Sequence, residues 1–350
     1  MGLSGSLKPL QRFLCRSCNT SFTSGRKRAR PGAKFADDVV EEAVRFYVQG
    51  LTSYRVLASL LEHRCGQSVG RAALNNWVHE LGQQAKSPLE VSIELRPRWG
   101  GFLGIDGKVI FIQGKRHCLL LGVDHPTQDL VHALVLPGET AEGLARLETE
   151  ARLDAGYELK GVVADLGAGF AQTHRDYFGA VPFQACRVHF DRRLDSDIPK
   201  AMWSAKAPLY AELKARIRAV LYAPTYDDGR LLLRALVDER VRFKGIGNVN
   251  VIRALERNFD VYMAHHLTPG LPPDNNVTEN VIKQLNKKLR LMEGFQSPES
   301  AEGYVRLLVG CYRFKRFTDS CRRADNGKAP LELAGVDLTG RDWLSFLLRR

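Results

Sequence analysis

Apolar side chains recur at three- and four-residue spacing over residues 35–86, which is the spacing of one face of an α-helix. The pattern predicts three helices, of which the second is capped by Thr52 or Ser53 and the third covers Arg71–Leu81. Three short helices with a tight turn between the second and the third are typical of a helix-turn-helix, whose final helix enters the major groove of DNA. An ordinary three-helix packing module with a solvated polar face fits the same pattern.

Beyond residue 98 the apolar positions form short runs typical of β-strands. The predicted order is three strands, helix, strand, helix and strand, at Phe102–Ile112, Arg116–Val123, Leu130–Leu136, Thr140–Leu153, Gly161–Ala164, a stretch after Gly169, and Phe183–Cys186. Residues 195–270 again show a helical pattern. We therefore predict an α/β domain over residues 98–330, with a mixed sheet flanked by helices and an all-α insertion. Ser87–Pro97 is expected to be a linker, and residues 331–350 a C-terminal tail.

Three carboxylates stand at notable places in this pattern. Asp106 interrupts the first strand, Asp165 ends the fourth, and Glu279 begins a basic helical stretch. A buried carboxylate is costly unless a cation accompanies it, and three that converge can hold two Mg²⁺ ions. Each also has a simpler explanation when taken alone. Asp106 could lie at the tip of a hairpin turn, Asp165 could cap the next helix, and Glu279 could be favoured by a helix dipole.

The order Asp106, Asp165, Glu279, with Cys186-Arg-Val-His189 between the last two, resembles the DDE transposases of bacterial and archaeal insertion sequences, most closely their Mutator-like branch. The spacings are 165 − 106 = 59 and 279 − 165 = 114 residues. The resemblance covers roughly residues 35–319. It implies an RNase H-like sheet in which the first and fourth strands are neighbours, with a helical insertion before the final Glu.

Other residues near these acids are candidates for positioning roles, namely Cys186, His189, Asn280, Lys283 and Lys287. The resemblance implies that the Cys-His pair lies beside the active site, and a role as satisfied core residues is the alternative. Two such ligands alone are too few for a metal site. The lysines share the face of Glu279, where they would lead a scissile phosphate to the site. Ion pairing on an exposed helix is the simpler explanation.

The charge of the chain suits a polyanionic partner. The sequence has 51 Lys and Arg against 39 Asp and Glu, a formal net charge of +12, and residues 1–34 hold eight Lys or Arg and no acid. A soluble protein that is merely basic is the alternative. We expect phosphate contacts from a basic arm and base contacts from the third helix. The arm residues are Arg26, Lys27, Arg28 and Arg30, and the candidate base readers are Arg71, Asn75, Asn76 and His79.

The cysteines indicate a reducing environment. Seven are spread along the chain without paired spacing except Cys15-x-x-Cys18, and no secretory signal precedes them. Cys15 and Cys18 resemble one knuckle of a zinc ribbon within residues 1–34. A bound zinc is not expected, because the second ligand pair is missing. No run reaches about 18 uninterrupted apolar residues. A cytoplasmic protein without a membrane span is therefore expected.

These expectations define a DNA transposase that cleaves the ends of an insertion sequence and transfers the 3′-OH into target DNA. Its cofactor would be two Mg²⁺ ions, for which Mn²⁺ could substitute. Its partner would be double-stranded DNA, both element ends and target, bound by a homo-oligomer. Two alternatives stay open: a transposase-derived DNA-binding protein without catalysis, and an RNase H-like nuclease.

Overall fold

The computed structural model describes residues 12–19, 21–23, 35–50, 52–65, 68–167, 169–197, 207–246 and 249–349. The four residues of the expected basic arm, Arg26, Lys27, Arg28 and Arg30, lie outside these ranges. Near the N-terminus, strands β1 (Arg12–Leu14) and β2 (Ser21–Thr23) pair antiparallel. The turn between them carries Cys15 and Cys18, and the Asn19 amide donates to the Cys15 carbonyl over 2.9 Å.

Three helices follow, at α1 (Asp37–Gln49), α2 (Tyr54–Cys65) and α3 (Arg71–Gln84). They enclose a shared core that includes Val44, Leu57 and Leu74, each about 1% exposed. The Ser53 hydroxyl accepts a hydrogen bond from the Val56 amide over 3.3 Å, so Ser53 caps the second helix. The three predicted helices are confirmed.

The expected linker is instead a helix, α4 (Pro88–Leu95). Ser87 and Glu90 form a capping box, in which each side chain accepts the backbone amide of the other residue. Pro88 stands at the first helical position, where its missing amide proton and fixed φ are favourable. The prediction of a linker is wrong, because Pro88 begins a helix here and does not break one.

A five-stranded mixed sheet forms the centre of the molecule, in the order β5-β4-β3-β6-β7. Its strands are β3 (Phe102–Ile112), β4 (Lys115–Asp124), β5 (Leu130–Leu136), β6 (Gly161–Ala164) and β7 (Phe183–Ala185). The first three pair antiparallel, whereas β6 runs parallel to β3 and β7 parallel to β6. The α/β class with a mixed sheet is confirmed.

Helices cover both faces of this sheet, because side chains alternate between the faces along each strand. Leu103 and Ile105 of β3 contribute to a core with α5 (Ala141–Leu153) and α6 (Phe170–Phe178). Ile110 and Ile112 point the other way, into a core with α13 (Asn276–Leu289) and α14 (Pro298–Phe314). This second core also includes the buried residues of α1 to α3, so the three-helix unit is packed onto the sheet domain.

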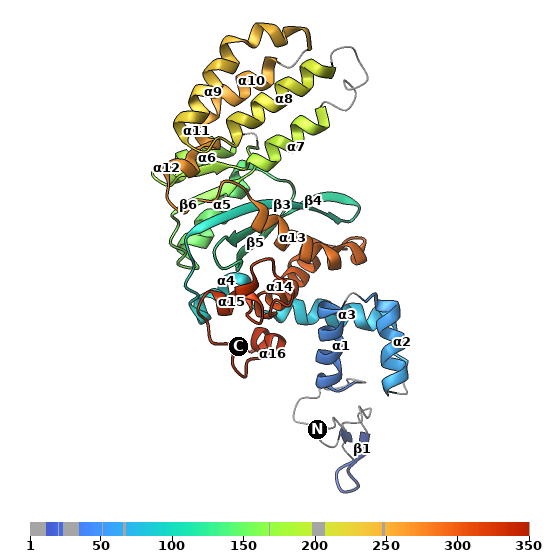
Figure 1. The fold of residues 1–350 in the computed structure, drawn as a ribbon. Coiled ribbons are helices and arrows are strands. Elements are labelled where there is room, and N and C mark those ends of the chain that lie inside the picture. Colours follow the sequence, from blue (N-terminus) through green and yellow to red (C-terminus); the bar gives the residue numbers. More distant parts are fainter. Residues whose placement is uncertain are drawn as a thin grey trace.

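The expected all-α insertion stands at one end of the molecule, with α1 to α3 toward the other end and the sheet between them (Figure 1). Its described helices are α7 (Arg187–Asp197), α8 (Ala207–Leu221), α9 (Tyr226–Asp238), the 3₁₀ helix η1 (Arg240–Ile246), α10 (Val249–Arg257), α11 (Phe259–Tyr262) and α12 (Ala264–Leu267). Its interior is apolar, and Ile217, Ile252 and Leu255 are fully buried.

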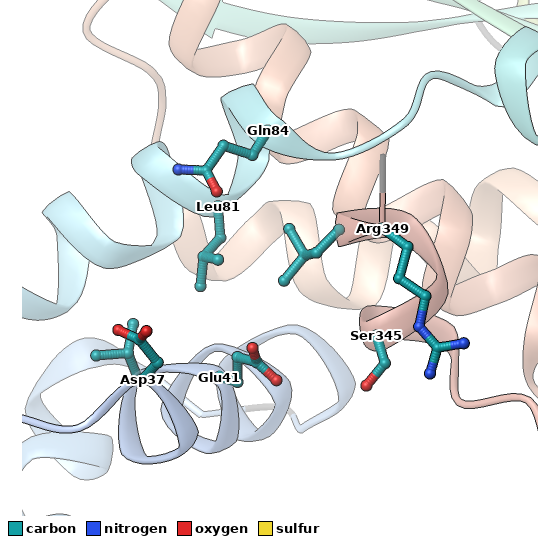
Figure 2. A pocket seen from close by; sticks show the side chains of 8 residues that line it. Asp37, Glu41, Leu81, Gln84, Ser345 and Arg349 are labelled. Atoms are coloured by element: carbon teal, nitrogen blue, oxygen red, sulfur yellow. The ribbon is translucent and has the colours of Figure 1, made fainter. Parts of the chain in front are cut away.

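The C-terminal residues are part of the core. After 3₁₀ helices η2 (Arg290–Met292) and η3 (Arg323–Asp325) come α15 (Pro330–Leu333) and α16 (Trp343–Leu348). Leu344 and Leu347 of α16 are buried against α14 and α3. A cavity of about 240 Å³ lies where α16 meets α1 and α3, with Glu41, Gln84 and Arg349 among its lining residues (Figure 2).

Two contacts hold α14 against α3, α4 and the turn before β5. Gly82 of α3 and Gly303 of α14 bring the helix backbones together, since a Cβ on Gly82 would lie 2.7 Å from the Gly303 carbonyl. Farther along, the fully buried Arg313 donates to both carboxylate oxygens of Asp129, over 2.9 and 2.8 Å. The same guanidinium donates to the Pro88 carbonyl and the Ser92 hydroxyl, and it thereby joins α14, α4 and the sheet.

Candidate functional site

Asp106 lies within β3, where it pairs with Leu121 of β4. The prediction of a strand position is confirmed, and the hairpin-tip alternative is excluded. One carboxylate oxygen accepts the Gly107 amide over 2.8 Å. On the other side of β3, pairing with β6 stops at Ile105 and Ala164, one residue before Asp106. Asp106 is therefore the first residue of β3 that is no longer paired with β6.

Asp165 follows directly after β6. Because β3 and β6 are parallel and Ile105 pairs with Ala164, Asp106 within β3 and Asp165 just past the end of β6 stand at the same level. The expected adjacency of the first and fourth strands is thus confirmed. Two carboxylates beside the end of β6 form a place where a cation would be stabilised.

Glu279 reaches this region on α13, which packs closely on β3. The approach depends on Gly104, since a Cβ there would lie 2.2 Å from the Thr278 hydroxyl and 2.5 Å from the Asn275 amide oxygen. Asn275 occupies the N-cap position without capping the helix through its side chain. Its side chain donates instead to the Ile105 carbonyl of β3 over 2.8 Å, next to Asp106. The first turn of α13 is therefore tied to the strand that carries Asp106.

Two arginines of α7 pair with these acids. Arg192 donates to both oxygens of Glu279 over 2.8 and 2.7 Å, and Arg193 donates to Asp165 over 2.9 and 3.1 Å. Both arginine side chains are more than half exposed, whereas that of Glu279 is 10% exposed. The ion pairs neutralise two of the three acids and leave the guanidinium groups at the surface. Such planar, exposed groups also suit phosphate oxygens.

Cys186, His189 and Glu279 form a cluster whose candidate ligand atoms all lie within 4.8 Å of one another. The His189 Nε2 is 3.8 Å from a Glu279 oxygen, and the backbone N–H of Asn275 donates to the Cys186 sulfur over 3.3 Å. The hydrogen bond with Cys186 and the charges of Asp165 and Asp106 raise the pKa of His189 to about 9. A set of sulfur, imidazole and carboxylate ligands is of the kind that binds zinc. Glu279 thus belongs to this cluster as well as to the three acids expected from the sequence.

A fourth acid, Glu139, was not found from the sequence. It stands between β5 and α5, just before the N-cap Thr140. A Cβ on Gly107 would lie 3.0 Å from its carboxylate. The pKa of Glu139 is raised, first by desolvation of its carboxylate and then by the charge of Asp165, although the residue is exposed as a whole. Its signal was an acid at a strand-to-helix junction, which alone is common in surface loops.

Burial raises the pKa of Asp106 to about 6, and the charges of Glu139 and Glu279 act in the same direction. The charge of His189 and the Gly107 amide oppose this change. A cation bound beside Asp106 would offset the negative charge of Glu139 and Glu279 and so stabilise the ionised form of Asp106.

The remaining predicted residues are at the surface. Asn280, Lys283 and Lys287 are exposed on α13, and the Lys283 ammonium is 3.5 Å from the Asn280 amide oxygen. The next residue, Lys288, is the buried one, at 3% exposed. It donates to the Thr52 carbonyl and lies over the Tyr47 ring, so it joins α13 to the three-helix unit.

Arg71, Asn75, Asn76 and His79 are all exposed on α3, as a base-reading face requires. The Cys15 and Cys18 turn is also at the surface, and hydrogen bonds from the Cys18 and Ser17 backbone and the Ser17 hydroxyl lower the pKa of Cys15 to about 7. Within the described ranges, neither sulfur belongs to a group of three candidate metal ligands.

No family model matches the chain, and no curated protein matches it. Across the described part of the chain, no helix combines the length and the apolar character needed to cross a membrane.

Proposed function

We propose that this protein is a DDE-type DNA transposase with an RNase H-like catalytic domain. The observation that carries the proposal is the placement of Asp106 and Asp165 on neighbouring parallel strands, with α13 and Glu279 tied to the same strand through Gly104 and Asn275. The exposed basic and amide side chains of α3 add a surface suited to DNA. The charge of Glu279 raises the pKa of Asp106, so a bound cation would relieve the repulsion between these two acids, which favours a role in cation binding.

The donor set fits magnesium, because Asp106, Asp165 and Glu279 supply carboxylate oxygens, the ligands that this ion prefers. These three residues would hold two ions, with Glu139 close by. When bound, the metals would activate the attacking oxygen and stabilise the leaving oxygen of a phosphodiester. Cys186 and His189 contribute softer atoms and hold α13 and α7 together beside the acids.

The chain's own residues would bind and orient the DNA. Arg192 and Arg193 pair with the acids through exposed guanidinium groups. On binding DNA, these groups would exchange the carboxylates for phosphate oxygens of the bound strand. In the first step water attacks the phosphodiester at the element end and a 3′-OH leaves. In the second step that 3′-OH attacks a target phosphodiester and displaces another 3′-OH. Each step forms one P–O bond and breaks one, so neither an ATP nor a covalent protein intermediate is needed.

The test is Mg²⁺-dependent cleavage of DNA that carries the element end. Asp106→Ala and Glu279→Ala should each abolish cleavage and leave DNA binding intact, whereas Glu158→Ala, at an 81% exposed side chain, serves as the control. Undiminished cleavage in either site variant would refute the proposal.

Two other functions give different products in one assay with element ends, a plasmid target and Mg²⁺. A transposase joins the ends to the plasmid. Cleavage without joining would indicate a nuclease, and binding without cleavage a regulator. The ion pairs of Arg192 with Glu279 and Arg193 with Asp165 are the features that favour a protein held inactive.

A further inference from the structure

A groove of about 700 Å³ separates the three-helix unit from the segment that follows α13. One wall is the face of α3 that presents Arg71, Asn75 and His79, which recur at four-residue spacing. The opposite wall is residues 291–297, between α13 and α14. We call this space the α3 groove. Asn76, on the neighbouring face of α3, is not among its lining residues.

Tyrosines line the inner end of the α3 groove. Tyr54 is partly exposed, and its ring stacks on that of Tyr47 with centroids 4.1 Å apart and planes at 8°. Tyr304, behind them, is 2% exposed, and its hydroxyl has no hydrogen-bond partner among the described residues. An unsatisfied buried hydroxyl next to a groove favours an occupant that carries hydrogen-bonding groups.

The charge of the α3 groove suits an anion. Arg55 and Arg71 are exposed at its rim together with His79, and one described lining residue, Glu293, is acidic. Amide and hydroxyl groups of Asn75, and of residues 296, 297 and 300, provide further donors and acceptors. Cations beside an aromatic ring form the usual combination for single-stranded nucleic acid, since the cations hold phosphates and the ring stacks on a base.

The size of the α3 groove limits the occupant. Its volume lies within the roughly 300–1,000 Å³ of sites for small ligands. It is therefore large enough for one or two nucleotides. A duplex instead accepts a whole helix into its major groove, which is about 12 Å wide. The wall formed by residues 291–297 faces Arg71, Asn75 and His79 from across the groove, whereas Asn76 stays available to a duplex.

We propose that the α3 groove binds unpaired nucleotides of one DNA strand, with phosphates at Arg55 and Arg71 and a base on the Tyr54 ring. The source of that strand, the frayed terminus of an element end, rests on the proposed function. The α3 groove would hold the terminal bases apart while the acids act on the DNA.

The probe is hexathymidylate labelled with fluorescein, and the measurement is its anisotropy with the full chain. Ala72 lines the α3 groove from α3, so Ala72→Trp should obstruct it and weaken binding at least tenfold. Gln84→Trp adds the same side chain to the same helix but points to the small cavity of Figure 2, and it should leave binding within twofold. Arg71→Gln adds no bulk and should also weaken binding. It provides the test if Ala72→Trp does not fold.

The proposal is overturned if the wild-type protein does not bind the probe, or if the folded Ala72→Trp variant or Arg71→Gln binds it as tightly as the wild type. The measurement needs neither Mg²⁺ nor cleavage. Loss of the proposed transposase activity and failure of this site are therefore told apart. A second readout is the preference for a duplex with three unpaired terminal nucleotides over a blunt one, which the wild type should show and Ala72→Trp should lose.

Discussion

Gly104→Ala tests whether the close packing of α13 on β3 sets the geometry of the acids. The added Cβ would stand 2.2 Å from the Thr278 hydroxyl and 2.5 Å from both the Asn275 amide oxygen and the His125 Nε2. Ordinary contacts begin at 3.4 Å. These side chains must therefore give way, and if the first turn of α13 moves as a unit, its shift is up to 3.4 − 2.2 = 1.2 Å and Glu279 moves with it.

The expected effects follow from this displacement. A shift of about 1 Å in a catalytic group can lower the rate by about 100-fold. Overpacking of this kind destabilises a protein by about 1–3 kcal/mol, and a strained Asn275–Ile105 hydrogen bond would add about 1 kcal/mol. We therefore expect cleavage to fall by about two orders of magnitude while the chain still folds.

The matched control is Gly122→Ala on the neighbouring strand. Its Cβ would meet the end of the Leu147 side chain at 2.7 Å, on the face covered by α5. This variant should lose stability and retain cleavage. The assays are urea unfolding, Mn²⁺ affinity by calorimetry, and cleavage of end DNA. If folded Gly104→Ala matches Gly122→Ala in both Mn²⁺ affinity and cleavage, α13 does not position the site through this contact.

Three further outcomes are expected. Arg192→Gln removes a cation that competes for Glu279, and since the arginine is more than half exposed we expect about a fivefold gain in Mn²⁺ affinity by calorimetry; a weaker affinity would contradict the competition. Burial lowers the pKa of Lys288 from 10.5 to about 8, so the unfolded chain holds its proton more strongly and stability should rise from pH 8 to 10.5, by 2.5 × 1.36 or about 3 kcal/mol. Urea unfolding should show this rise to be absent in Lys288→Met. Arg313→Met leaves Asp129 buried without its cation and should lower the free energy of unfolding by about 3–5 kcal/mol; a loss below 1 kcal/mol would refute the importance of this pair.

Local patterns were sufficient for the strands. Phe102–Ile112, Leu130–Leu136 and Gly161–Ala164 were predicted with the bounds that the structure has, because buried strands of this kind are continuous apolar runs between polar turns. The helix at Pro88–Leu95 was missed although its capping box is equally local. Proline ends a helix at most positions, and only its place between Ser87 and Glu90 marks Pro88 as a helix start.

The contacts between the candidate site residues could not be predicted in the same way. Arg192 and Glu279 are 87 positions apart, and their pairing depends on how α7 and α13 pack around the sheet. Glu139 comes near Asp106 only because β5 and β3 lie in one sheet with the junction before α5 at their shared end. Asn275 looked like a helix cap, and its bond to β3 follows from the short distance that Gly104 permits. Such features require the three-dimensional register of several elements.

The backbone contact between Gly82 and Gly303 fixes the position of α3 relative to α14. Neither α3 nor α14 can slide past the other without a clash, and α14 packs on the sheet that carries Asp106. Under the proposed function, the distance along the DNA between the nucleotides held at α3 and the bond that is cut is then a property of the protein. One base pair inserted between them would move the phosphodiester about 3.4 Å along the helix axis and turn it away from the acids. Each end would therefore be cut at one register or not at all.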